Sequence, residues 1–100
     1  MKTLRPEDQE VLKRFENHCR AQGLSTMRII KYLYTLRKIS QMLGKPFKEA
    51  TREDIERIIV NLENSDFSIW TKQGYKVILK RFYRWLRGTE DYPEEVKWIK

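Results

Sequence analysis

Four stretches of this 100-residue chain have the same boundaries: a residue that can cap a helix, then apolar residues at helical spacing, then a residue that ends a helix. No stretch alternates apolar and polar residues with the period of two that marks a strand, and no Asn-Gly or Asp-Gly hairpin signal occurs. The pattern therefore predicts an all-α fold, a compact bundle of four helices.

The boundaries of these helices follow from local chemistry. Ser25 and Ser68 are suitable N-caps, and Thr51 begins an approximate capping box. Gly44 and Gly88 are suitable C-terminal stops because glycine adopts the left-handed conformation that ends many helices. The expected helices cover residues 6–22, Ser25 to Leu43, Thr51 to Asn64, and Ser68 to Leu86.

Each expected helix has an apolar stripe that should form its share of the core. Gly74 interrupts the fourth helix at a cost of about 1 kcal/mol relative to alanine, which favours close packing of another helix against it. Trp70 and Val77 fall at the border of the stripe. The expected core residues are Val11, Leu12, Phe15, Cys19, Ile29, Tyr32, Leu33, Leu36, Ile39, Leu43, Ile55, Ile58, Ile59, Leu62, Tyr75, Ile78, Leu79, Phe82, Trp85 and Leu86.

Positive charge is segregated along the chain. The net charge is +7, and two acid-free stretches, residues 17–48 and 67–89, hold seven and six of the 21 Lys and Arg residues. Like charges four residues apart destabilise a helix by a few tenths of a kcal/mol per pair, yet one helix carries a row of four cations at this spacing. A polyanionic partner would explain that row. The row is Lys72, Lys76, Lys80 and Arg84.

A second basic face is expected on the helix that begins at Ser25. Its outer side should carry Arg28, Lys31, Thr35 and Lys38, together with Tyr34. Tyr34 either covers the edge of the bundle or reaches a phosphate oxygen. An acidic protein could use the same cations. An anionic membrane is disfavoured because the apolar faces of both basic helices are needed for the core.

Four motifs in order resemble the N-terminal, SAM-like core-binding domain of tyrosine recombinases, the phage-type integrases. The family patterns are S-x-x-T-I-x-x-Y-x-x-x-L before G-K, then T-x-x-D-I, then S-x-x-T before L-R-x-F-Y-x-W-L, and the match spans about residues 24–88. Arg28 stands where the family usually has Thr, and Ile39 stands where it often has Phe, an exchange within the core. The matching residues are Ser25, Tyr32, Leu36, Ile39, Leu43, Gly44, Lys45, Thr51, Asp54, Ile55, Ser68, Thr71 and residues 79–86.

The resemblance implies that two long helices cross the major groove of double-stranded DNA as half of a clamp. It also implies further recombinase protomers as partners, in a tetramer on DNA, and a catalytic domain beyond this chain. Residues 1–88 would then be the DNA-binding domain, and residues 89–100 a linker stub, although docking of this segment onto the bundle is equally compatible with its sequence. The implied DNA-binding residues are Arg28, Lys31, Thr35, Lys38, Thr71, Lys72, Gln73, Lys76, Lys80 and Arg84.

The residues for catalysis or metal binding are sparse. The only cysteine, Cys19, lies beside the only histidine, His18, with no metal-ligand spacing around them, and no tyrosine has a nearby group to activate it. We therefore expect no enzymatic activity in this chain, no cofactor and no small-molecule substrate. The N-terminus lacks the apolar stretch of a signal peptide, which favours a cytoplasmic location. The rival function is a stand-alone helical adaptor that binds an acidic protein partner.

Overall fold

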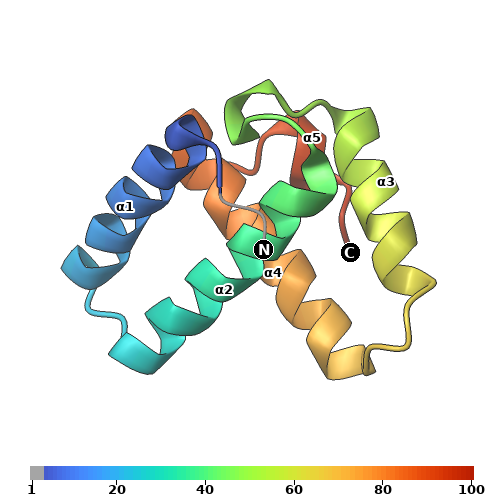
Figure 1. The fold of residues 1–100 in the computed structure, drawn as a ribbon, viewed down its shortest axis with the longest axis horizontal. Coiled ribbons are helices and arrows are strands. Elements are labelled where there is room, and N and C mark those ends of the chain that lie inside the picture. The colour runs from blue at the N-terminus through green and yellow to red at the C-terminus, as the bar shows by residue number, and fades with distance from the viewer. Residues whose placement is uncertain (1–3) are drawn as a thin grey trace. The chain divides into compact units, whose positions relative to one another are not determined.

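A computed structural model of the chain describes residues 4–100, and every regular element within that range is helical. The prediction of an all-α fold with four principal helices is therefore confirmed (Figure 1). Two short elements, η1 and α5, were not expected. The elements are α1 (Pro6–Ala21), α2 (Thr26–Leu43), the 3-10 helix η1 (Phe47–Glu49), α3 (Arg52–Glu63), α4 (Ile69–Arg87) and α5 (Glu94–Lys97).

The principal helices begin and end where their capping residues predict. The Ser25 hydroxyl accepts a hydrogen bond from the backbone N–H of Arg28 at 3.3 Å, and Ser68 caps α4 in the same way. Thr51 and Asp54 form a complete capping box. Gly44 and Gly88 end α2 and α4 with φ angles of 72° and 68°, a backbone conformation that a side chain would strain.

The chain separates into two compact units at a boundary that the sequence did not suggest. Residues up to Phe47 form unit 1, and residues 48–100 form unit 2. Unit 1 consists of α1 and α2, and unit 2 contains α3, α4 and α5. The sequence placed a domain boundary after residue 88 instead.

In unit 1, α1 packs against α2 as a helical hairpin. The Phe15 and Tyr32 rings stack with their centroids 6.4 Å apart. Asp8, in the first turn of α1, is buried and connects this helix to Ser40 in α2 and to Phe47. Its carboxylate accepts hydrogen bonds from the Ser40 hydroxyl at 2.6 Å and from the Phe47 backbone N–H at 3.1 Å. A buried carboxylate is therefore part of the architecture of unit 1.

In unit 2, α5 packs against both α3 and α4. Val96 in α5 is fully buried, and Ile99 just after it is 4% exposed. Of the two alternatives for residues 89–100, the structure therefore shows docking. The Trp98 indole N–H donates a hydrogen bond to the Glu95 carbonyl at 2.8 Å, which holds the short helix together.

Most of the expected core is confirmed. The apolar stripes of α1 and α3 are buried as predicted. Leu33, Trp85 and Leu86 are only half-buried, so their assignment to the core interior was wrong. Tyr83, which the helical projection did not place in the core, is completely buried and meets Phe82 edge to face at 5.3 Å.

The prediction of close helix packing at Gly74 is wrong. A Cβ atom built on Gly74 has no heavy atom within 4 Å among its non-local neighbours, so nothing in the described chain needs the space. Gly74→Ala should therefore stabilise α4, by about 0.5–1 kcal/mol, because alanine restricts the unfolded chain and favours the helix. Urea denaturation followed by circular dichroism measures the change. A loss of stability would show that the glycine serves a contact outside the described fold.

Candidate nucleic-acid interface

The outer face of α2 presents cations to solvent. Arg28 and Lys31 are exposed, and α2 contains no acidic residue. Within residues 4–100, neither side chain forms an ion pair. Lys38 is half-buried, with its Nζ 5.0 Å from the centroid of the Tyr34 ring. Three of the four residues that were expected here thus belong to an accessible basic surface.

Thr35 does not belong to this surface. It is 5% exposed, so its expected role as a contact on the outer side is wrong. Thr35 lies three residues after Tyr32 and four before Ile39, both of which are buried. Residues at these spacings share one helical face, and the core face of α2 is wide enough to include Thr35.

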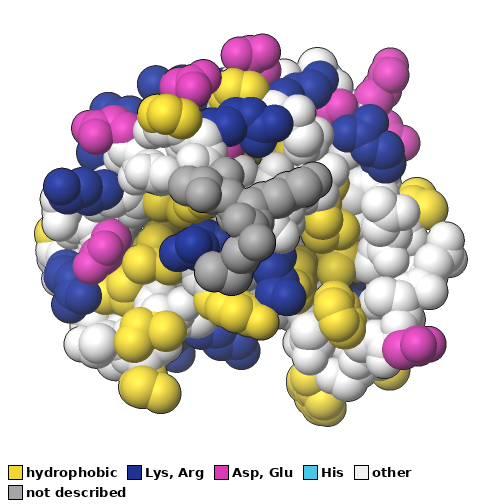
Figure 2. All heavy atoms as spheres, in the orientation of Figure 1, with side chains coloured by type: hydrophobic (Ala, Val, Ile, Leu, Met, Phe, Trp, Pro, Cys, Tyr) yellow, Lys and Arg dark blue, Asp and Glu magenta, His cyan; other side chains and the backbone are white. Residues whose placement is uncertain are grey.

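Apolar side chains are interspersed with these cations. Met27, Ile30 and Tyr34 are 76%, 55% and 61% exposed, at the i, i+3 and i+7 spacing of one helical face. Figure 2 shows hydrophobic side chains reaching the surface alongside Lys and Arg. The expectation that the basic helices keep their apolar residues for the core is therefore wrong for α2. It is also wrong for the first turn of α4, where Ile69 and Trp70 are 79% and 85% exposed.

Lys72 and Lys76, the first half of the row on α4, bind the end of the neighbouring helix. The Lys72 ammonium donates to the backbone carbonyl of Glu63 at 3.1 Å, and Lys76 pairs with the Glu63 carboxylate at 3.1 Å. Glu63 is the last residue of α3, where the helix dipole also favours positive charge. The Lys76 side chain is only 17% exposed. These two lysines have a structural explanation that needs no polyanion.

Lys80 and Arg84, the second half of the row, lie beneath the C-terminal segment. The Lys80 Nζ is 4.5 Å from the centroid of the Tyr92 ring, and the Arg84 guanidinium is 4.9 Å from it. Lys80 also donates a hydrogen bond to the backbone carbonyl of Ile99 at 3.2 Å. No local pattern indicated that Tyr92 would contact this row, because Tyr92 lies 8 residues after Arg84 and beyond the end of α4.

The two polar residues expected at the start of α4 differ in their surroundings. Both Thr71 and Gln73 are exposed. The Thr71 hydroxyl accepts a hydrogen bond from the Ser68 hydroxyl at 3.1 Å. The backbone N–H of Thr71 in turn donates to the Ser68 Oγ. Thr71 is therefore part of the N-terminal cap, whereas Gln73 is exposed on the first turns of the helix.

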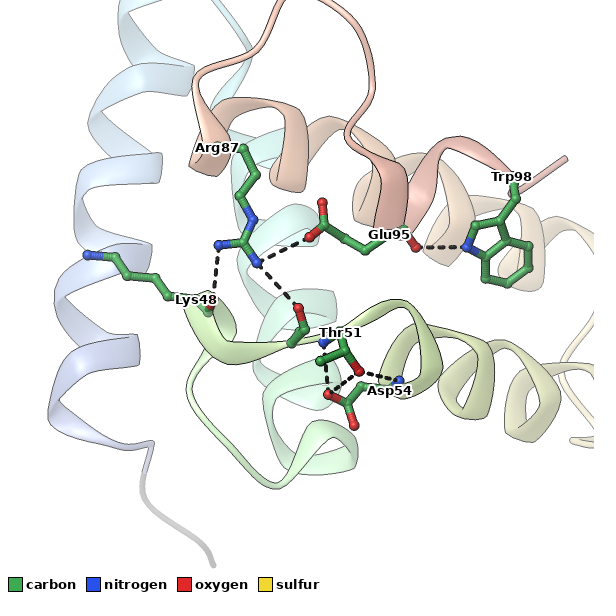
Figure 3. Close-up of polar contacts among 7 residues, drawn as sticks. Lys48, Thr51, Asp54, Arg87, Glu95 and Trp98 are labelled. Atoms are coloured by element: carbon green, nitrogen blue, oxygen red, sulfur yellow. Dashed lines mark hydrogen bonds and ion pairs between the residues drawn. The ribbon is translucent and has the colours of Figure 1, made fainter.

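Arg87 holds unit 2 together at the opposite end of α4 (Figure 3). Its guanidinium donates to the backbone carbonyls of Lys48 at 2.9 Å and Ala50 at 3.4 Å, and it pairs with Glu95 at 3.3 Å. One arginine thus joins the segment before α3, the end of α4 and the start of α5. Its cationic charge is used for architecture, as is that of Lys76.

The described residues offer little that metal binding or nucleophilic chemistry requires. Residues 4–100 contain no cluster of three or more His, Cys, Asp or Glu that could hold a metal ion. Burial raises the pKa of the Cys19 thiol above its ordinary value, which disfavours the reactive thiolate. His18 stacks on Phe15 with ring centroids 6.1 Å apart. No helix in this range is long and apolar enough to cross a membrane.

Comparisons of the chain with protein-family models, with curated proteins and with solved structures find no match. The resemblance to tyrosine recombinases therefore rests on the sequence motifs alone. Several of those motif positions now have structural roles: Ser25, Thr51, Asp54 and Ser68 cap helices, and Tyr32 lies in the core.

Proposed function

We propose that the chain binds double-stranded DNA through the outer face of α2. The observation that carries the proposal is the outer face of α2, on which Arg28 and Lys31 are exposed and Lys38 is half-buried, in a helix without any acid. Phosphate contacts from such side chains release counterions and are the main source of affinity for duplexes. Exposed Gln73 on α4 is a further polar group able to read a base edge.

The resemblance to recombinase core-binding domains supports the same partner and adds a context. In this proposal the chain positions a recombination site for a catalytic domain elsewhere, acts with further protomers on DNA, and catalyses no step itself. It acts in the cytoplasm and takes no cofactor or small-molecule substrate.

Binding to a labelled duplex should fall steeply with salt and depend on the position of charge. The double variant Lys31→Glu with Lys38→Glu should weaken binding about tenfold or more at low salt, because it replaces two phosphate contacts by repulsion. It should also make the slope of log affinity against log salt shallower by about two. Fluorescence anisotropy at several salt concentrations measures both quantities.

The matched control is Lys13→Glu with Arg14→Glu on α1. These side chains are also exposed, and the variant has the same net charge as the first. It should lose far less affinity because its cations lie outside the proposed face. Equal losses in the two variants would mean that only net charge matters. Duplex binding by the wild type that is absent at low salt, or insensitive to salt, would contradict DNA as the partner.

A second candidate function is docking of an acidic protein partner on the same helix. It is favoured by the exposed Met27, Ile30 and Tyr34, whose spacing is that of the anchors in helix recognition. Apolar contact is insensitive to moderate salt, whereas phosphate contact is not. The salt titration of the duplex therefore separates the two candidates. If the chain does not bind duplex DNA at low salt, the result favours an acidic protein as the partner.

A further inference from the structure

The segment from Tyr92 to Ile99 occupies half of the basic row on α4. The Tyr92 ring lies over both Lys80 and Arg84, at 4.5 and 4.9 Å from its centroid. The Ile99 carbonyl accepts a hydrogen bond from Lys80, so this cation meets the segment at two points. All of these contacts lie within unit 2.

The contacts of this segment differ in strength. Val96 is fully buried and Ile99 nearly so, and the removal of such apolar side chains from water stabilises the docked segment. Tyr92 is half-buried, and its hold on the two cations is electrostatic and partly solvated. The ring can therefore leave α4 while the apolar anchor remains in place.

We infer that Tyr92 is an intramolecular cover that competes with a polyanion for Lys80 and Arg84. The inference rests on the proposed DNA binding. With the ring in place, Lys80 and Arg84 face the Tyr92 ring, and a phosphate cannot occupy the same position. Because the anchor holds the ring close by, its effective concentration at α4 is high, and a phosphate must displace it. Lys80 and Arg84 then contact a polyanion only after this displacement.

Tyr92→Ala should therefore tighten binding to a duplex at low salt, by about two- to fivefold, the amount that corresponds to a partly exposed cation–π contact. Tyr92→Phe, which keeps the ring, should match the wild type. Fluorescence anisotropy measures the affinities, and thermal melts followed by circular dichroism show that each variant is folded. If Tyr92→Ala melts well below the wild type, its affinity is measured at a temperature where both proteins are fully folded.

A double-mutant cycle assigns the effect to the two cations. In a background with Lys80→Ala and Arg84→Ala, Tyr92→Ala should no longer change the affinity. A gain that persists in this background, or a Tyr92→Ala protein that binds like the wild type, overturns the inference. If that result comes with wild-type binding that is lost in Lys31→Glu with Lys38→Glu, the proposed function stands and only the cover fails. If neither the wild type nor Tyr92→Ala binds the duplex, both fail.

Discussion

Asp8→Ala should lower the free energy of unfolding by about 2–4 kcal/mol. The carboxylate of Asp8 is 1% exposed and satisfies two donors that lie far away in sequence, the Ser40 hydroxyl and the Phe47 backbone N–H. Alanine removes both charge-assisted hydrogen bonds and leaves two buried donors without an acceptor, which costs more than the bonds alone. Urea denaturation followed by circular dichroism measures the loss.

The matched control for Asp8 is its neighbour Glu7, which is exposed in the same first turn of α1. Glu7→Ala also removes an acid that favours the helix dipole, so it should cost only a few tenths of a kcal/mol up to about 1 kcal/mol. Asp8→Asn keeps one carbonyl oxygen as an acceptor and should fall between the two. Similar small losses for Asp8→Ala and Glu7→Ala would show that the buried hydrogen bonds contribute little.

Arg87→Ala should lower the free energy of unfolding by about 1.5–3 kcal/mol. The substitution leaves the carbonyls of Lys48 and Ala50 without their charged donor and removes the ion pair with Glu95. The Arg87 side chain is 28% exposed, so water reaches part of the site and limits the loss. Thermal and urea melts of the two proteins provide the comparison.

Lys97→Ala is the matched control, because Lys97 lies in α5 of the same unit and is exposed. It changes the net charge by the same amount and should cost less than about 1 kcal/mol. Glu95→Gln tests the ion pair separately and should account for only a small part of the Arg87 effect. A stability loss at Arg87 no larger than that at Lys97 would remove Arg87 as the residue that joins the three segments.

The cations of α4 show why the pattern of charge along the sequence is an incomplete guide to a binding surface. The row on α4 suggested a polyanion because its cations repel one another and no acid interrupts them. Lys76 and Arg87 meet acids that lie 13 residues before and 8 residues after them, and Lys80 meets an aromatic ring and a carbonyl. On α2, Arg28 and Lys31 are exposed and form no ion pair within residues 4–100, which is why the proposed interface rests on this helix.

The positions that carry the family resemblance are mostly structural and do not identify a binding surface. Ser25, Thr51 and Ser68 match the family pattern, and each caps a helix here. Phe82 matches it as well and is completely buried. These positions are helix caps and core, whereas the proposed contact with DNA would need exposed side chains such as Lys31, at which the motifs specify no residue.

The helices and their ends could be predicted from sequence because capping, glycine stops and apolar periodicity act within a few residues of one another. The confirmed cores of α1 and α3 have the same origin. Tertiary structure alone decided which charges are accessible. The partners of Asp8 lie 32 and 39 residues away, and Tyr92 meets Lys80 in a segment whose helix α5 packs against α4. Such contacts depend on how elements pack, and no local pattern in the chain encodes that packing.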